Sequence, residues 1–272
     1  MMKMNTEVQN TAAVGKVYAG IDVGASRTKV VLLDAQKNII GHAVRKSGTD
    51  FVASASTGLA EAMKMAGITE ADITAAVSTG YGRRNVAVAK GSKTEISCHG
   101  KGCYHDYPRA QTIIDIGGQD NKIIKMDDAG RRTGFKMNRK CAAGTGAFLE
   151  EMSARLDIPL ESMNAMAEQS ENMVELGSFC TVFSATEVLE KIRAGRKVPD
   201  IVKGLFLSMI KRVLEMDALT DAVVMTGGVV AHNPYLVTMA AQQVGRPILV
   251  PPHPQLTGAL GAALYAMEEN SS

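Results

Sequence analysis

An internal repeat restricts the possible folds of this 272-residue chain more than any other feature. The segment from Ile21 to Asp34 aligns without a gap on the segment from Ile114 to Asp127. The isoleucine, aspartate, glycine, lysine and closing aspartate coincide, and most apolar positions match in kind. Each copy contains two β-rich runs joined by a small polar turn, which is typical of a β-hairpin. The repeat therefore predicts an α/β protein with two halves built on one plan.

The length and composition of the chain suit two packed halves. With 46% hydrophobic residues, the chain can bury one large core or the cores of two subdomains. We predict a flexible tail over residues 1–16, a first subdomain over 17–103 and a second over 104–272. No low-complexity linker separates the halves, and the last helix, from Thr257 to Met267, is expected to pack back on the first.

The charge pattern and the apolar runs exclude several classes of protein. The formal net charge is +2 with mixed signs and only 4% aromatic residues, so binding of nucleic acid is not indicated. Residues 1–15 contain no apolar run and do not resemble a signal peptide. The most apolar run, from Leu256 to Met267, is shorter than the roughly 20 residues that cross a membrane. We expect a soluble, cytoplasmic protein.

The remaining secondary structure follows from the spacing of apolar residues. Strands are expected over 75–80, 222–228 and 247–252, and a helix or loop over 95–102. An extended piece is expected before Cys180. Helices are expected over 58–65, 148–156, 160–169, 181–192, 201–216, 233–240 and 257–267.

The turns of the repeated hairpins have a composition that suits a nucleotide phosphate. Gly24, Gly117 and Gly118 would let the backbone approach a phosphate closely, because a Cβ atom would block it. Asp22 and Asp115 lie at the mouths of the hairpins, where carboxylates hold Mg²⁺ directly or through water. These turns predict a phosphate and magnesium site that uses both halves.

A third glycine turn strengthens this prediction. Gly227 and Gly228 follow an apolar run and would offer a flat surface to an adenine ring. Each turn alone fits an ordinary glycine-containing hairpin, but three turns in this order, two of them repeated, favour a nucleotide site. A G-x-x-x-x-G-K-[ST] loop is absent from the sequence, so a P-loop NTPase is excluded as a motif match.

The loop from Asn138 to Gly146 combines a thiol with a possible anion site. Gly144, Thr145 and Gly146 lead into a predicted helix, whose N-terminus can bind phosphate through backbone N–H groups. The positive end of the same helix would stabilise a thiolate at Cys141. Two chemistries, phosphate binding and thiol chemistry, therefore meet in one loop.

Cys141 and Cys180 each precede a predicted helix. One interpretation is that both are buried small hydrophobic residues, the commoner fate of an isolated intracellular cysteine. The other is metal binding, since two cysteines per chain cannot complete a four-thiolate iron–sulfur cluster but two chains related by a twofold axis can.

The order of the motifs resembles that of the actin, Hsp70 and sugar-kinase superfamily, in which two ribonuclease-H-like halves enclose ATP in the cleft between them. The resemblance implies that residues 22–29 form the first phosphate loop, 115–120 the second and 226–229 the adenosine motif. The residues expected to contact ATP are Gly24, Ser26, Lys29, Gly117, Gly118, Gly144, Thr145, Gly146, Gly227, Gly228 and Gln255.

Five motifs together resemble the BadF/BadG/BcrA/BcrD ATPase family; they lie at residues 79–83, 114–120, 138–146, 180–183 and 254–263. The resemblance implies a homodimer, or a paired heterodimer, that shares one [4Fe–4S] cluster through Cys141 and Cys180 of each subunit. Cys98 and Cys103 match no ligand of that pattern and are expected to be structural. Ala147 departs from the pattern, where a larger, often basic residue is expected, and this change would affect docking of a partner.

The family resemblance implies an ATP-hydrolysing activator. Reduced ferredoxin or flavodoxin would supply a low-potential electron, and ATP hydrolysis would move the halves and pass the electron to a 2-hydroxyacyl-CoA dehydratase. Gln119 or Asp120 is expected to position the attacking water, and Glu187 is either a cleft residue or a solvated helix residue. The alternatives are an ATP-binding subunit of benzoyl-CoA reductase, a small-molecule kinase of the same superfamily, and a non-catalytic ATP-dependent sensor.

Overall fold

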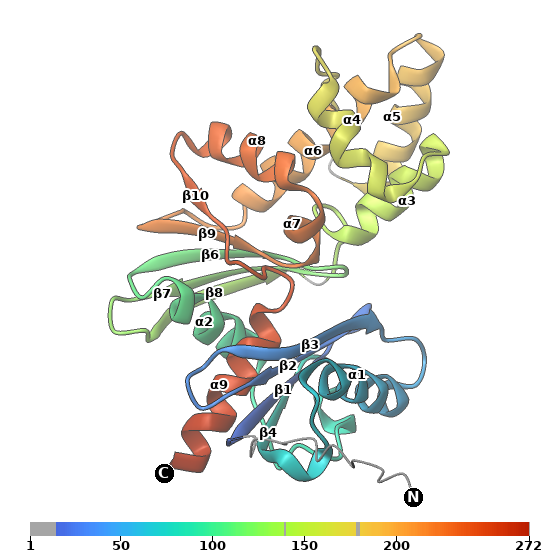
Figure 1. Ribbon diagram of the computed structural model, residues 1–272. Helices are drawn as coiled ribbons and strands as arrows, with labels where there is room; N and C mark the ends of the chain where they lie inside the picture. The colour runs from blue at the N-terminus through green and yellow to red at the C-terminus, as the bar shows by residue number, and fades with distance from the viewer. Residues whose placement is uncertain (1–14, 139, 178–179, 272) are drawn as a thin grey trace, which may run out of the picture.

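The structure, a computed structural model, describes residues 15–138, 140–177 and 180–271. Within these residues the strands form two five-stranded sheets, with helices between the sheets and on their outer faces (Figure 1). Arg139 and nearly all of the tail predicted over 1–16 lie outside the described residues. The two sheets agree with a fold of two halves.

The first sheet has the strand order β3-β2-β1-β4-β5. Strands β1 and β2 form the first repeated hairpin, in which Asp22 lies opposite Lys29. Strand β4 runs parallel to β1 and places Thr79 beside Asp22. The strands are β1 (Val17–Val23), β2 (Arg27–Leu33), β3 (Ile39–Lys46), β4 (Ile73–Thr79) and β5 (Gly91–Ser92).

The second sheet repeats this plan with the order β10-β9-β6-β7-β8. Strands β6 and β7 form the second hairpin, in which Asp115 lies opposite Lys122, and β9 runs parallel to β6 with Thr226 beside Asp115. Both hairpins predicted from the repeat are confirmed. The strands are β6 (Gln111–Ile116), β7 (Asn121–Met126), β8 (Arg132–Asn138), β9 (Ala222–Thr226) and β10 (Ile248–Leu249).

Each hairpin is extended by a third strand that the sequence analysis missed. Strand β3 pairs with β2, and β8 pairs with β7, both antiparallel. None of the residues of β8 is buried, because β8 lies at the edge of its sheet. Without a buried face, β8 lacks the alternation that identifies a strand in a sequence.

Helices on the outer faces close the core of each half. Helix α1 (Phe51–Ala66) packs on β2 and β3, and begins seven residues before the predicted start because Asp50 caps it by accepting a hydrogen bond from Ala53 N. In the second half, α6 (Val198–Leu214) and α8 (Pro234–Val244) contribute to a large core around Phe148 and Phe206. The short helices are α7 (Gly228–His232), η1 (Glu70–Asp72) and η2 (Arg83–Asn85).

Two helices pack against each other between the sheets. Helix α2 (Glu95–Asp106) places Ile96 and Cys103 on the second sheet, while α9 (Thr257–Ser271) packs on strands β1, β2 and β4 of the first. A Cβ atom on Gly20 would overlap the carbonyl oxygen of Ala259 in α9. The boundary predicted between residues 103 and 104 falls inside α2, and the division of the chain there stays a prediction.

Three further helices form a group beside the second half (Figure 1). They are α3 (Gly146–Leu156), α4 (Met163–Gln169), which follows the short helix η3 (Leu160–Ser162), and α5 (Thr181–Arg193). Cys141 lies in the loop before α3, and Cys180 is the residue that precedes α5. The group therefore carries both cysteines that the sequence analysis selected.

Among the described residues, no helix is both long and apolar enough to span a bilayer. A cytoplasmic location stays a prediction.

The close approach between β1 and α9 yields a test of the packing between them. Gly20→Ala should lower the free energy of unfolding by about 1–3 kcal/mol or more, because the new methyl group meets backbone that cannot move without shifting α9. Gly134→Ala in the edge strand β8 is the matched control, since a Cβ there meets no atom of the described chain within 4 Å, and it should change stability by less than about 0.5 kcal/mol. Equal effects of the two changes in denaturant unfolding would contradict the packing described here.

Candidate active site

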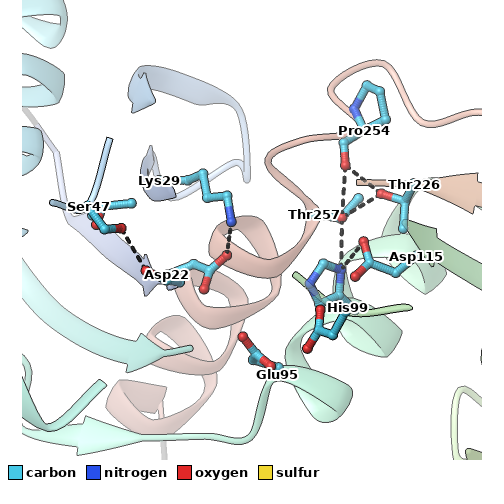
Figure 2. A network of polar contacts seen from close by, with 12 residues as sticks. Asp22, Lys29, Ser47, Glu95, His99, Asp115, Thr226, Pro254 and Thr257 are labelled. Carbon is cyan, nitrogen blue, oxygen red and sulfur yellow. Dashed lines mark hydrogen bonds and ion pairs between the residues drawn. The ribbon is translucent and has the colours of Figure 1, made fainter. Parts of the chain in front are cut away.

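A buried carboxylate lies one residue before the end of the first strand of each repeated hairpin. Asp22 in β1 and Asp115 in β6 are both only 2% exposed. The Asp22 Oδ2 atom lies 2.9 Å from Lys29 Nζ, and the Asp115 Oδ2 atom lies 3.2 Å from Lys122 Nζ. Because each lysine lies opposite its aspartate in the antiparallel register, the sequence repeat becomes a repeated ion pair. Figure 2 shows the two aspartates with Glu95 and His99 between them in that view.

The second oxygen of each carboxylate has a different environment. Asp22 Oδ1 and Asp115 Oδ1 are buried and accept no hydrogen bond from any residue that the structure describes. Gly80 and Gly227, both with positive φ, lie against them, so that a Cβ would be 2.6 Å from Asp22 Oδ1 or 2.8 Å from Asp115 Oδ1. Buried oxygens without a partner are costly unless a ligand uses them. Two such carboxylate oxygens fit Mg²⁺ or its bound water.

Lys122 joins several acidic groups of the second half. Its Nζ lies 2.7 Å from Asp120 Oδ1 and 3.8 Å from Glu95 Oε2, in addition to Asp115. Burial alone would lower the pKa of Lys122. The charges of Asp115 and Glu95 raise it by more than this, so the net pKa is above its usual value. Burial likewise raises the pKa of Asp115, but His99 and Lys122 outweigh this effect and leave that pKa below its usual value. Asp115 is therefore an anion at neutral pH.

The two predicted phosphate loops have the same turn. Gly24 N donates to Arg27 O at 3.1 Å, and Gly117 N donates to Asp120 O at 2.9 Å. These four residues occupy equivalent positions in the repeat. The loops also face each other, because a Cβ atom on Gly118 would lie 2.8 Å from Ser26 Oγ. The structure thus brings Gly24, Ser26, Gly117 and Gly118 to one place between the halves.

The loop before α3 is bonded directly to the second phosphate loop. Gly146 N donates to Gly117 O at 2.9 Å, and Ala147 N donates to Gly118 O at 2.8 Å. This differs from the expectation that these N–H groups face a phosphate, because carbonyl groups of the chain already accept their hydrogens. The contact instead ties the start of α3 to the phosphate loop. Whether Gly146 also contacts ATP stays a prediction.

The rest of this loop is held in the same way. Thr145 is fully buried, and both its N and its Oγ1 donate to Ala142 O, at 3.0 and 2.7 Å. Gly144 O accepts a hydrogen bond of 2.8 Å from Asn121 Nδ2, and Asn121 follows directly after the second phosphate loop. The segment between Cys141 and α3 therefore has fixed contacts to the hairpin that carries Asp115.

The adenosine motif lies beside Asp115. Gly227 N donates to Pro254 O at 2.8 Å. A Cβ atom on Gly228 would lie 3.2 Å from Gln255 Nε2, so the predicted residues Gly227, Gly228 and Gln255 come together. By contrast, Gln119 lies in the turn and is exposed. Its role in positioning water, like that of Asp120, stays a prediction.

The two selected cysteines lie near the surface. Cys141 is half-buried, and its N–H donates to Asn138 Oδ1 at 3.3 Å, while Cys180 is exposed at the start of α5. Ala142 and Thr181, the residues that follow them, line one hollow of about 510 Å³ between α3 and α5. Among the described residues, no group of three or more His, Cys, Asp or Glu side chains could hold a metal ion. A four-thiolate cluster here would need ligands from a second chain.

The other cysteines have a different environment. Cys98 and Cys103 are completely buried in α2, and burial raises the pKa of the Cys98 thiol to about 12. A buried neutral thiol is a poor metal ligand, which agrees with the structural role expected for both. Glu187 of α5 lies away from the phosphate loops and accepts a hydrogen bond of 2.9 Å from Gly177 N.

Sequence reasoning missed part of the site. Lys122 aligned with Lys29 in the repeat, and this match was the signal that could have identified it. Gly80 lay in a family motif but was given no role. Glu95 and His99 gave no signal, because only the packing of α2 brings them to the aspartates.

Comparison with known proteins agrees with this geometry. The activator of lactoyl-CoA dehydratase from Anaerotignum propionicum is 44% identical over 252 residues, which are 92% of this chain and 96% of that protein. The solved activator of the 2-hydroxyisocaproyl-CoA dehydratase from Clostridium difficile, with bound ADPNP, is 39% identical with a TM-score of 0.87. That match covers 94% of this chain and 96% of the solved one.

More distant proteins define the limits of the similarity. A benzoyl-CoA reductase subunit from Thauera aromatica is 28% identical over 264 residues, which are 92% of each protein. A ROK family glucokinase from Streptomyces griseus, solved with glucose and AMPPNP, is 11% identical with a TM-score of 0.57. The match covers 93% of this chain and 99% of the glucokinase chain, and at this identity it shows the fold alone. The α/β fold of the actin, Hsp70 and sugar-kinase type is confirmed. A family model matches residues 19–266, and the chain belongs to the BadF/BadG/BcrA/BcrD ATPase family, as the motifs predicted.

Proposed function

We propose that this protein is an ATP-hydrolysing activator that passes a low-potential electron to a 2-hydroxyacyl-CoA dehydratase. The observation that carries the proposal is the pair of hydrogen bonds from Gly146 and Ala147 to the second phosphate loop. They join a nucleotide site to the loop that contains Cys141. Similarity to dehydratase activators supplies the class of partner.

The nucleotide end of the protein uses both halves. Asp22 and Asp115 would hold Mg²⁺. The bound ion would supply the electrostatic stabilisation for transfer of a phosphoryl group from ATP to water. Backbone groups of the two facing loops, together with Ser26 and Lys29, would bind the phosphates. Gly227, Gly228 and Gln255 would bind the adenosine, and Gln119 or Asp120 would position the water.

The contacts of the second phosphate loop couple ATP to the cysteine loop. A movement of Gly117 must displace Gly146, or else break the hydrogen bond between them. Asn121 links the same hairpin to Gly144. A nucleotide that contacts Gly117 and Gly118 in one state and not in another would favour one position of the Cys141 loop over another.

The cysteine end would be completed by a second subunit. Cys141 and Cys180 of each chain would hold one [4Fe–4S] cluster, in a homodimer or a paired heterodimer. When bound, the cluster would supply one-electron transfer between ferredoxin or flavodoxin and the partner enzyme. Cys180 precedes α5, so the positive end of that helix would stabilise a cluster with a net negative charge.

The function of an ATP-binding subunit of benzoyl-CoA reductase is the second candidate, because one subunit of such an enzyme is similar over 92% of this chain. Its 28% identity is well below the 44% found for a dehydratase activator. The proposal therefore favours the activator. Anaerobic co-purification distinguishes the two, since a reductase subunit stays in a stable complex and an activator binds its enzyme transiently.

The ligand assignment predicts the iron content of a cysteine variant. Anaerobically purified protein should contain about four irons per two chains, and Cys141→Ser should remove them because the shared cluster loses two ligands. Binding of ATP should persist. Cys98→Ala is the matched control and should keep its iron, since Cys98 is buried in α2. Full iron content in Cys141→Ser would contradict the assignment.

The paired aspartates predict the response of ATP hydrolysis to Mg²⁺. Asp115→Asn should lower the rate of phosphate release by about 10-fold to 100-fold or more, since even residues that only support a metal ligand cost this much when changed. Asp34→Asn, at the far end of the first hairpin and on an exposed turn, is the control and should hydrolyse ATP normally. Equal rates for the two variants over a Mg²⁺ titration would exclude Asp115 from the site.

A further inference from the structure

One buried histidine contacts both halves and has no role in the proposed function so far. His99 of α2 is 7% exposed, and its Nδ1 lies 3.6 Å from Asp115 Oδ1 and 3.2 Å from Thr257 Oγ1 (Figure 2). Asp115 belongs to the second sheet, while Thr257 opens α9, which packs on the first. A single imidazole ring thus joins a proposed magnesium ligand to the helix of the other half.

Hydroxyl groups fix the orientation of this ring. Thr257 Oγ1 lies 2.7 Å from Thr226 Oγ1, and both hydroxyls are within hydrogen-bond distance of Pro254 O. Thr226 lies beside Asp115 in the parallel ladder and directly precedes Gly227 of the adenosine motif. A carboxylate oxygen and a hydroxyl oxygen both face Nδ1, so a hydrogen on this nitrogen would have two acceptors.

The other side of the ring faces the first half. A Cβ atom on Gly258 would lie 3.0 Å from His99 Nε2 and 3.2 Å from Asp22 Oδ2. The backbone at Gly258 therefore separates the ring from Asp22, with no room for a side chain. His99 is confined between the two carboxylates that the proposed function assigns to Mg²⁺.

The two oxygens of Asp115 have different neighbours. Lys122 Nζ is bound to the other oxygen, Oδ2, and to Asp120. Asp115 Oδ1 accepts no hydrogen bond from the described residues, and His99 Nδ1 lies at ion-pair distance from it. Oδ1 of Asp115 therefore lies next to the ring that α2 carries.

We propose that His99 is a positioning residue for phosphoryl transfer, in which its Nδ1–H orients the Asp115 carboxylate toward the magnesium ion. The contact of His99 with Thr257 makes this orientation depend on the packing of α2 against α9. The inference rests on the proposed nucleotide site between Asp22 and Asp115. It adds that the arrangement of the two halves controls how well that site binds Mg²⁺. A histidine that only fills the core would affect stability and leave the metal dependence of binding unchanged.

Three substitutions separate these roles. His99→Asn keeps a nitrogen donor near the position of Nδ1, His99→Gln moves the donor toward the position of Nε2, and His99→Leu removes it. Calorimetry with full-length protein measures the affinity for ADP with Mg²⁺ and with EDTA. We expect His99→Leu and His99→Gln to weaken Mg²⁺–ADP binding by about 10-fold or more, and His99→Asn to stay within about threefold of the wild type. ADP binding in EDTA should not change.

The outcomes distinguish this inference from the proposed function. If the wild type binds Mg²⁺–ADP and all three variants bind it equally well, His99 does not position Asp115 and the proposed function stands. Equal weakening of all three, in EDTA as in Mg²⁺, would also overturn the inference by showing a structural role. A wild type that binds no nucleotide overturns both. If His99→Leu does not fold, the Asn and Gln variants give the same decision.

Discussion

The rest of the structure depends on a buried aspartate–lysine pair that closes each repeated hairpin. Burying a carboxylate is costly unless a cation and hydrogen bonds compensate it, and removing one partner leaves an uncompensated charge. Lys29 and Lys122 each bind one oxygen of their aspartate and leave the second oxygen without a hydrogen bond from the described chain. Gly80 and Gly227 lie directly against these oxygens, where the Cβ atom of any other residue would collide with them. The fold thus holds two carboxylates that would suit a cation.

The two halves differ in the segment that contains Cys141 and Cys180. In the first half β3 leads through a short loop to α1 and then to β4. In the second half the chain leaves β8, passes Cys141, forms α3, α4 and α5, and only then reaches α6 and β9. The second phosphate loop is therefore the one bonded to the cysteine loop, through Gly117 and Gly118. This asymmetry would give ATP a mechanical route to the electron-transfer end.

The sequence allowed the prediction of those parts of the site that local patterns encode. The register of a hairpin follows from its turn, so the repeat placed Asp22 and Asp115 at equivalent positions. Strand β8 was missed because its side chains are not buried, and a strand without a buried face has no clear period. Glu95 and His99 were missed because their role arises from the packing of α2 between the sheets. The hydrogen bond from the Gly146 N–H to Gly117 O could not be predicted, since it depends on a contact between two loops.

The central claim is that the nucleotide state moves the Cys141 loop, and the alkylation rate of Cys141 in cluster-free protein tests it most directly. The protein carries Cys180→Ser, so that of the two selected thiols Cys141 alone can react. If the second phosphate loop moves the cysteine loop, the rate should differ by about fivefold or more between Mg²⁺–ADP and a non-hydrolysable ATP analogue. Asp115→Asn should abolish this difference. Identical rates in both nucleotide states, with binding of both nucleotides demonstrated, would contradict the coupling.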